Sequence, residues 1–247
     1  VEYTWINVAT LRLDHRFNEH LSLRNMLRYS NVDREAFPSP PRIMGTPTPN
    51  TPLSQIIIAP GQPGRETSES IIDNQLDLLA RFQTFGFNHT LLTGFEIGAE
   101  SFDAVRYAFT NIPTTPLVHP NPFRDSSRMT QSVSARTDTD TFLLGIYFSD
   151  TIKLLPQLDL VGGVRYDYCD ADFKNRLTTE KLSSNDNMWS YRAGLVFHPW
   201  PTHSYYFAYS NSYNPSAEAL QLAATTVDTP PEEIATRSTR GSRNAAA

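Results

Sequence analysis

Hydrophobic and polar residues alternate with a period of two along eight segments of the chain. In the segment 158–173, for example, Leu158, Leu160 and Val164 alternate with Asp159 and Arg165. Such alternation is typical of β-strands that have one apolar face and one polar face. We therefore predict an all-β, antiparallel structure. Its eight strands cover about residues 5–17, 21–34, 71–83, 87–107, 137–155, 158–173, 188–198 and 204–213.

The connections between these segments are alternately short and long. Short turns are expected at 18–20, 85–86, 156–157 and 199–202, and long polar links at 35–70, 108–136, 174–187 and from 214 onward. The first long link holds eight prolines. Long links at only one end of a series of hairpins are unusual in compact soluble domains but normal for outer-membrane β-barrels. The pattern thus predicts strands that cross a membrane, with the long links outside the cell.

Aromatic residues lie toward both ends of the predicted strands. Phe17, Phe82, Phe87 and Phe197 are next to short turns, whereas Tyr166 and other aromatic residues lie toward the long links. Aromatic girdles at both membrane interfaces are a feature of barrel walls. A soluble β-sandwich with these residues in its core is the alternative, but it does not explain aromatic residues at both strand ends.

Composition narrows the function classes. Apolar residues make up 39% of the 247 residues, and the mean hydropathy is −0.39. No apolar run approaches the roughly 18 to 20 residues of a membrane helix. The net charge is −5 without a basic block, so we expect no nucleic-acid partner. The single cysteine excludes an internal disulfide, and the six histidines lack the spacing of metal ligands.

Motifs for catalysis are missing from the sequence, which contains no GxSxG, P-loop or GxGxxG pattern. We therefore predict that the protein is not an enzyme and name no catalytic residue. Asp150, Asp167, Asp170 and Asp172 could suggest a cation site, but alternation puts Asp167 on the opposite face from Asp170 and Asp172. We interpret these carboxylates as solvated groups and predict no metal site.

Seven arginines are expected on the polar face of the strands. We expect them to pair with carboxylates such as those of Asp14, Asp77, Glu96 and Asp159, since opposite charges across strands stabilise a sheet modestly. The arginines are Arg12, Arg16, Arg24, Arg28, Arg81, Arg165 and Arg192.

Four hairpins of the sequence resemble those of TonB-dependent siderophore receptors. The residues that carry the resemblance include "HTLLTGFE" at 89–96 and "GGVRYD" at 162–167, and together they cover about 9–232. The catecholate and ferric-siderophore branch is the most similar. The resemblance implies about eight strands of a 22-stranded barrel, with the N-terminal plug domain of the family absent from these residues.

The resemblance also defines the expected domains. Residues 1–232 are expected to form part of a receptor barrel, and 233–247 an atypical, disordered tail that departs from the family pattern. Because alternation begins directly after Val1, without an initiator Met or a signal peptide, we expect the chain to be a piece of a longer protein. We expect this piece alone to be inactive in transport, since its two open sheet edges would be unpaired in lipid.

The function that the resemblance implies is transport. The whole receptor would lie in the outer membrane, bind a ferric siderophore as its transported ligand, need no cofactor, and import the ligand with energy delivered by the TonB complex through the plug. Outer-membrane lipid and lipopolysaccharide would contact the barrel wall. A passive porin-like or autotransporter-type barrel, or a soluble β-sandwich that binds carbohydrate, are the alternatives.

Ligand contacts are expected in the external loops and at the outer ends of strands. An anionic ferric chelate with aromatic arms favours arginine and aromatic side chains. The alternative is that the aromatic residues form the outer girdle and the arginines meet lipopolysaccharide phosphates. The predicted contacts are Arg106, Tyr107, Phe123, Arg124, Arg128, Tyr168, Trp189 and Tyr213.

Overall fold

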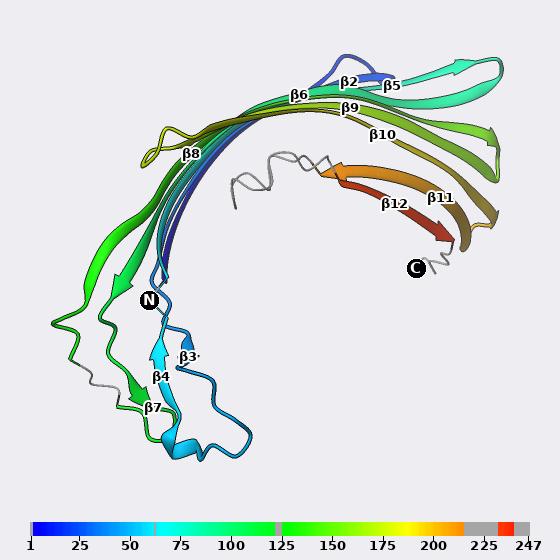
Figure 1. Cartoon of the computed structure of the whole chain (residues 1–247). Helices are drawn as coiled ribbons and strands as arrows, with labels where there is room; N and C mark the ends of the chain where they lie inside the picture. The colour runs from blue at the N-terminus through cyan, green and yellow to red at the C-terminus, as the bar shows by residue number, and fades with distance from the viewer. Residues whose placement is uncertain (1, 62, 122–124, 215–231, 240–247) are drawn as a thin grey trace.

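The chain folds into one long, curved antiparallel sheet. A computed structural model describes residues 2–61, 63–121, 125–214 and 232–239. The sheet has nine strands in the order β1-β2-β5-β6-β8-β9-β10-β11-β12, and Figure 1 shows it bent into an open arc. The strands are β1 (Glu2–Arg16), β2 (Leu21–Ala36), β5 (Gly64–Thr84), β6 (Phe87–Thr110), β8 (Thr130–Leu155), β9 (Leu158–Asn175), β10 (Lys181–Trp200), β11 (His203–Asn214) and β12 (Glu232–Thr239).

All eight predicted strands are present, and several are longer than the alternation indicated. Strand β8 has 26 residues, β6 has 24 and β5 has 21. A tilted strand needs only about 9 to 11 residues to cross a bilayer. The strands therefore continue well past the apolar segments that revealed them, toward the end of the sheet that carries the long links.

One expected long link is in fact a short turn. Strand β9 continues to Asn175 and β10 begins at Lys181, so 176–180 replaces the predicted link of 174–187. The register runs without a break from Lys181↔Lys174 to Phe197↔Leu158. The prediction was wrong because residues 181–187 are polar except for Leu182, which removes the alternation without preventing backbone pairing.

The other two described links contain structure that the sequence did not reveal. Strands β3 (Pro41–Ile43), β4 (Ile57–Pro60) and β7 (Thr115–Pro116) form a small second sheet, and a 3₁₀ helix, η1, covers Leu53–Gln55. The Leu117 N–H donates to the Ile56 carbonyl oxygen at 2.8 Å, which joins the two links. In Figure 1 this small sheet lies at the long-link end of the arc.

The last strand begins close to the expected boundary at residue 232. Strand β12 pairs with β11 from Asn214↔Glu232 to Phe207↔Thr239. Strand β12 therefore covers 233–239 of the atypical tail expected over 233–247. Residues 240–247 lie outside the described residues.

Short turns at one end of the sheet match the prediction. Phe85 and Gly86 both have positive φ angles, of 52° and 82°, and link β5 directly to β6. Two-residue hairpins favour this geometry because its twist matches that of the strands. At the β1–β2 turn, the Asn18 side-chain oxygen accepts hydrogen bonds from the His20 and Leu21 N–H groups at 2.8 and 2.9 Å.

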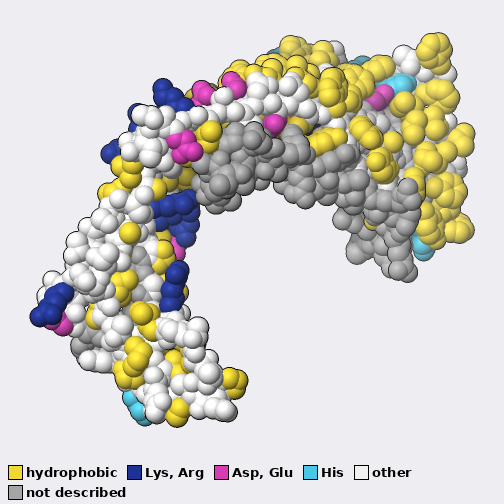
Figure 2. All heavy atoms as spheres, in the orientation of Figure 1, with side chains coloured by type: hydrophobic (Ala, Val, Ile, Leu, Met, Phe, Trp, Pro, Cys, Tyr) yellow, Lys and Arg dark blue, Asp and Glu magenta, His cyan; other side chains and the backbone are white. Residues whose placement is uncertain are grey.

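The two faces of the sheet differ in chemistry. We call one face the apolar face because its side chains are apolar over the half of the sheet nearest the short turns. It includes the exposed side chains of Leu11, Leu13, Phe95, Ile97, Ile146, Phe148, Val164 and Leu195. Figure 2 shows hydrophobic side chains covering that end of the molecule. The polar face is the opposite one, and it carries residues such as Arg12, Asp77, Glu96, Arg165 and Arg192.

Two polar side chains on the apolar face satisfy each other. Asn25 lies between Leu13 and Leu76 in the register. Its side-chain nitrogen donates to the Asn74 side-chain oxygen at 3.0 Å, and the Asn74 nitrogen donates back at 3.3 Å. Each nitrogen also donates to a backbone carbonyl. This reciprocal pairing lowers the cost of placing two amides in an apolar band.

Buried residues are few because the sheet is a single layer. A small cluster of buried side chains, Cys169, Ala171, Phe173 and Met188, lies on β9 and β10 beyond the apolar segments. Large apolar residues elsewhere are exposed: Leu11 keeps 69% of its surface accessible. No helix among the described residues is long and apolar enough to cross a bilayer.

The two faces should respond differently to a charge. We expect Leu11→Lys to destabilise the intact protein in the membrane by about 2 to 4 kcal/mol, because it puts a cation into the lipid-facing band. Thr10→Lys, one residue away on the polar face, is the matched control and should cost less than about 1 kcal/mol. Urea unfolding of protein inserted in lipid vesicles measures both. Equal effects would contradict the assignment of the faces.

Candidate functional site

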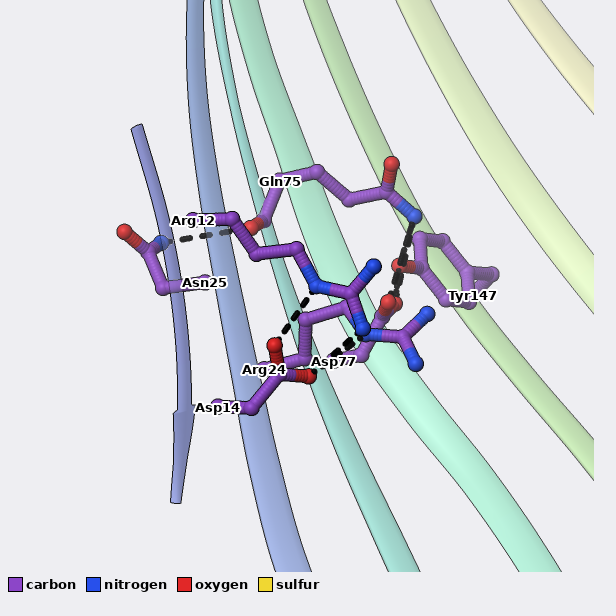
Figure 3. A network of polar contacts seen from close by, with 7 residues as sticks. All are labelled: Arg12, Asp14, Arg24, Asn25, Gln75, Asp77 and Tyr147. Atoms are coloured by element: carbon purple, nitrogen blue, oxygen red, sulfur yellow. Dashed lines mark hydrogen bonds and ion pairs between the residues drawn. The ribbon is translucent and has the colours of Figure 1, made fainter. Parts of the chain in front are cut away.

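The polar face carries a network of side chains that crosses five neighbouring strands. Asp14 of β1 accepts hydrogen bonds from Arg12 at 2.6 Å and from Arg24 of β2 at 3.1 Å. Arg24 lies directly opposite Asp77 of β5. Asp77 in turn accepts a hydrogen bond from the Tyr147 hydroxyl of β8. Figure 3 shows the two bonded groups, Arg12–Asp14–Arg24 and Asp77–Tyr147, next to each other on the sheet, so polar side chains line this face across the strands.

Long side chains reach across this surface over glycines. The Tyr147 ring lies over Gly94, its register partner on β6, and reaches Asp77 on β5. A methyl group at Gly94 would come within 2.7 Å of the Tyr147 hydroxyl oxygen. The Gln75 side chain donates to the same hydroxyl at 3.1 Å. Glycine is needed at this position because it alone lets the tyrosine lie flat.

Two arginines repeat the arrangement on the next strands. Arg165 of β9 lies over Gly145 of β8 and donates to Glu96 of β6 at 2.9 Å. It also donates to Asp167 on its own strand at 2.7 Å. Arg192 of β10 lies over Gly163 of β9 and donates to Ser149 of β8 at 2.7 Å. Tyr147, Arg165 and Arg192 therefore each cross the neighbouring strand and bond to the strand beyond it. In all three cases the side chain points toward the β1 edge of the sheet.

The sequence predicted part of this network. The expectation that arginines of this face pair with these carboxylates is confirmed for Arg12 and Arg24 with Asp14 and for Arg165 with Glu96. Asp77 bonds instead to Tyr147, which the sequence analysis did not single out, and Asp159 lies 3.4 Å from His198. Within the described chain Arg16, Arg28 and Arg81 make no ion pair. A glycine opposite an aromatic residue in the register was the signal that could have revealed Tyr147.

A shallow groove lies beside the two arginine crossings. It has a volume of about 390 Å³, and Tyr147, Ser149, Arg165, Ser190 and Arg192 are among its lining residues. All five belong to the polar face. The groove combines aromatic surface with two guanidinium groups, which suits an anionic or hydrogen-bonding partner.

The predicted ligand contacts do not form one site. Arg106 is exposed on the polar face of β6, opposite Arg65. Tyr107, after a break in register, donates its hydroxyl to Glu66 at 3.0 Å, and burial next to Glu66 raises its pKa. Tyr168 lies on the same side of the sheet as the apolar face, where its hydroxyl oxygen accepts a hydrogen bond from the Asn185 side chain at 2.6 Å. Arg106 and Tyr107 therefore point to opposite sides of the sheet.

The remaining predicted contacts are spread over three elements. Trp189 stacks obliquely on Tyr166 with ring centres 4.9 Å apart, in the position of an outer aromatic girdle. Tyr213 on β11 packs against the cluster around Cys169. Arg128 is exposed in the turn before β8. Phe123 and Arg124 lie outside the described residues.

A histidine at the short-turn end joins three strands. The His89 ring bonds to Asp150 at 2.6 Å through one nitrogen and to Thr84 at 2.8 Å through the other. It also stacks on Phe82 at 4.9 Å. The His89 side chain is only 12% exposed. These contacts hold the β5–β6 hairpin to β8.

The described residues of the polar face offer neither a metal-binding cluster nor a reactive thiol. In the part of the chain that the structure describes, no group of three or more His, Cys, Asp or Glu side chains could hold a metal ion. Cys169 lies beyond the apolar band and is buried with 2% of its surface exposed. Burial, together with the nearby carboxylates of Asp186 and Asp170, raises the pKa of its thiol to about 11. The thiol is therefore protonated and unreactive.

Comparison with known proteins identifies the family. The family model described as "TonB dependent receptor-like, beta-barrel" matches residues 2–238. The chain belongs to this receptor family. Membership places the sheet in the outer membrane and confirms the transmembrane barrel fold expected from the sequence.

Individual relatives are distant and longer than this chain. The catecholate siderophore receptor Fiu of Escherichia coli K12 is 23% identical over 236 residues, covering 85% of this chain and 30% of the relative. The closed-form crystal structure of Fiu superposes with a TM-score of 0.82 at 22% identity, over 96% of this chain and 38% of that one. The siderophore receptor PiuA of Acinetobacter baumannii gives 0.80 at 19%, over 96% and 37%. The chain thus spans about a third of the length of these receptors.

The glycine beneath Tyr147 should be essential for the receptor wall. A side chain at Gly94 would collide with the Leu76 carbonyl oxygen, so Gly94→Ala should destabilise the intact receptor by about 1 to 3 kcal/mol. Gly162→Ala is the matched control, because nothing lies within 4 Å of its Cβ position, and should change stability by less than about 0.5 kcal/mol. Urea unfolding in lipid vesicles measures both, and a tolerated Gly94→Ala would contradict the close approach of Leu76 and Tyr147 to Gly94.

The thiol of Cys169 should resist alkylation in the folded receptor. With its pKa raised to about 11, the thiolate fraction at pH 8 falls below that of an ordinary cysteine. Iodoacetamide should therefore label this site slowly at pH 8 and rapidly after unfolding, as read by mass spectrometry of the peptide. Fast labelling of the folded protein would show that the cluster around Cys169 is open to solvent.

Proposed function

We propose that this chain is part of the wall of an outer-membrane receptor that binds a ferric siderophore and imports it into the periplasm. The observation that carries the proposal is the two-faced sheet of this receptor family, whose polar face is lined by bonded polar side chains that suit a wide, hydrated barrel. Fiu and PiuA are named as siderophore receptors, and Fiu as a ferric-catecholate import receptor. Their names support the same class of ligand for this chain.

The partners follow from the family and from the faces of the sheet. The TonB complex would supply energy through a plug domain, which residues 1–247 do not include in our interpretation. Lipid would cover the apolar face, and lipopolysaccharide would meet the charged strand ends beyond it. The ferric siderophore is the transported ligand, so no resident cofactor, catalytic group or nucleic-acid partner is proposed.

The alternatives differ in what the polar face would do. A passive porin-like or autotransporter-type barrel also has a polar interior, but the family model favours the receptor. A soluble β-sandwich would need a second sheet to cover the apolar face. Among the described residues, the second sheet has only three short strands and lies at the long-link end.

Uptake of iron tests the proposal directly. Cells lacking the full-length gene should lose uptake of radioactive iron supplied as a ferric catecholate under iron limitation, and the gene should restore it only when TonB is present. Restoration without TonB would favour a passive barrel. Recovery of the folded full-length protein as a monomer without detergent would contradict the membrane placement.

A further inference from the structure

One acidic side chain lies on the apolar face, near the short turns. Asp150 of β8 follows Phe148 of that face by two positions and is directly opposite Leu91 of β6 and Gly162 of β9 in the register. Its side chain is only 15% exposed. A carboxylate on a lipid-facing surface is costly unless its oxygens have partners. The contacts of Asp150 therefore decide what this position is for.

Only half of the Asp150 carboxylate is occupied. His89 bonds to the Oδ2 atom at 2.6 Å, and the same ring is held by Thr84 at 2.8 Å and by stacking on Phe82 at 4.9 Å. The Oδ1 atom is buried and has no hydrogen-bond partner among the described residues. A buried acceptor without a donor costs free energy. The carboxylate therefore retains a vacant acceptor although its neighbour is firmly fixed.

The surrounding sheet does not supply the missing donor. The register of β8 with β6 and with β9 runs unbroken through Asp150, so the neighbouring backbone N–H groups belong to the ladder. Leu91 and Gly162, its partners on this face, have no side-chain donor. The nearby cations Arg81 and Lys153 are opposite Thr90 and Asp159 in the register, on the polar face. A donor for Oδ1 would have to come from outside the sheet.

Both the position and the local shape of Asp150 favour a lipid headgroup as that donor. At Gly162 no other atom lies within 4 Å of a Cβ position, so there is open space beside the carboxylate on the lipid-facing side. The pair Phe82↔His89 is one step nearer the short turns than Asp150. Aromatic residues at such turns mark the interface where headgroups lie, and the short turns of outer-membrane barrels are periplasmic.

We propose that Asp150 binds the ammonium group of an ethanolamine phospholipid from the periplasmic leaflet. A primary ammonium offers three N–H donors and a positive charge, and a charge-assisted hydrogen bond to a carboxylate is stronger than a neutral one. His89 holds the carboxylate through Oδ2 and leaves Oδ1 for the lipid. The inference goes beyond the proposed function, because it depends on the membrane placement of the sheet and not on the transported ligand.

A comparison of two lipids tests the site. A quaternary choline ammonium carries the same charge as an ethanolamine ammonium but has no N–H donor. The full-length receptor in detergent should therefore bind phosphatidylethanolamine about tenfold more tightly than phosphatidylcholine with the same acyl chains. Titrations followed by native mass spectrometry measure both affinities. Equal affinities for the wild type would show that the carboxylate does not select N–H donors of a lipid and would overturn the proposal.

Two matched variants assign the preference to one carboxylate. Asp150→Asn keeps the shape of the side chain but removes its charge, so the ratio of the two affinities should fall to less than about threefold. Asp159→Asn should keep the ratio near tenfold, because Asp159 also lies close to a histidine, His198, but on the polar face. Each ratio compares two lipids on the same protein, so a general loss of stability does not affect it. An equal fall in both variants would overturn the site.

His89→Gln separates the carboxylate from the imidazole. This variant removes the ring that bonds to Oδ2 and leaves the carboxylate in place, so the preference for phosphatidylethanolamine should persist. A preference that is lost in His89→Gln and kept in Asp150→Asn would assign the contact to the imidazole and the lipid phosphate. That result would overturn the ammonium site.

Discussion

Backbone hydrogen bonding between neighbouring strands is the constraint on which the rest of this structure depends. A bilayer offers no water to an unpaired N–H or C=O group, so each strand must pair along its whole membrane-spanning length. Pairing in one fixed register then sends alternate side chains to opposite faces. The apolar face and the polar face are therefore both set by the same strand pairing. On the apolar face, the Asn25 and Asn74 side chains satisfy each other's hydrogen-bond donors.

The same register arranges the polar face. Tyr147, Arg165 and Arg192 can lie flat because Gly94, Gly145 and Gly163 stand beside them on the preceding strands. Each crossing ties together three strands through side chains as well as through the backbone. Because these side chains lie along the sheet, they do not project far into the barrel interior. That leaves space in a wide barrel for a ligand or a further domain of the receptor.

The sequence was informative where a residue's neighbours along the chain decide its structure. Period-two alternation is local, so the eight strands and their faces could be predicted, as could the turn at Phe85 and Gly86. Alternation disappears in the mostly polar stretch 181–187 and in the long links, so the start of β10 and the pairing of β4 with β7 were missed. The bond of Tyr147 to Asp77 was missed because the two residues are 70 positions apart in the sequence.

Charge follows the same division between membrane and water. Within the apolar band, charged residues on the polar face meet opposite charges, as Arg24 does with Asp14 and Asp77 in the register. Like-charged register partners occur beyond that band in the described strands, including Glu35↔Glu66, Asp103↔Asp138 and Arg65↔Arg106. The first two face away from the polar face, and Asp138 forms an ion pair there with Arg176. Arg65 is partly buried on the polar face, 5.8 Å from the centre of the Phe102 ring. Like charges in register therefore occur where water can reach the strands, and opposite charges occur where lipid covers the sheet.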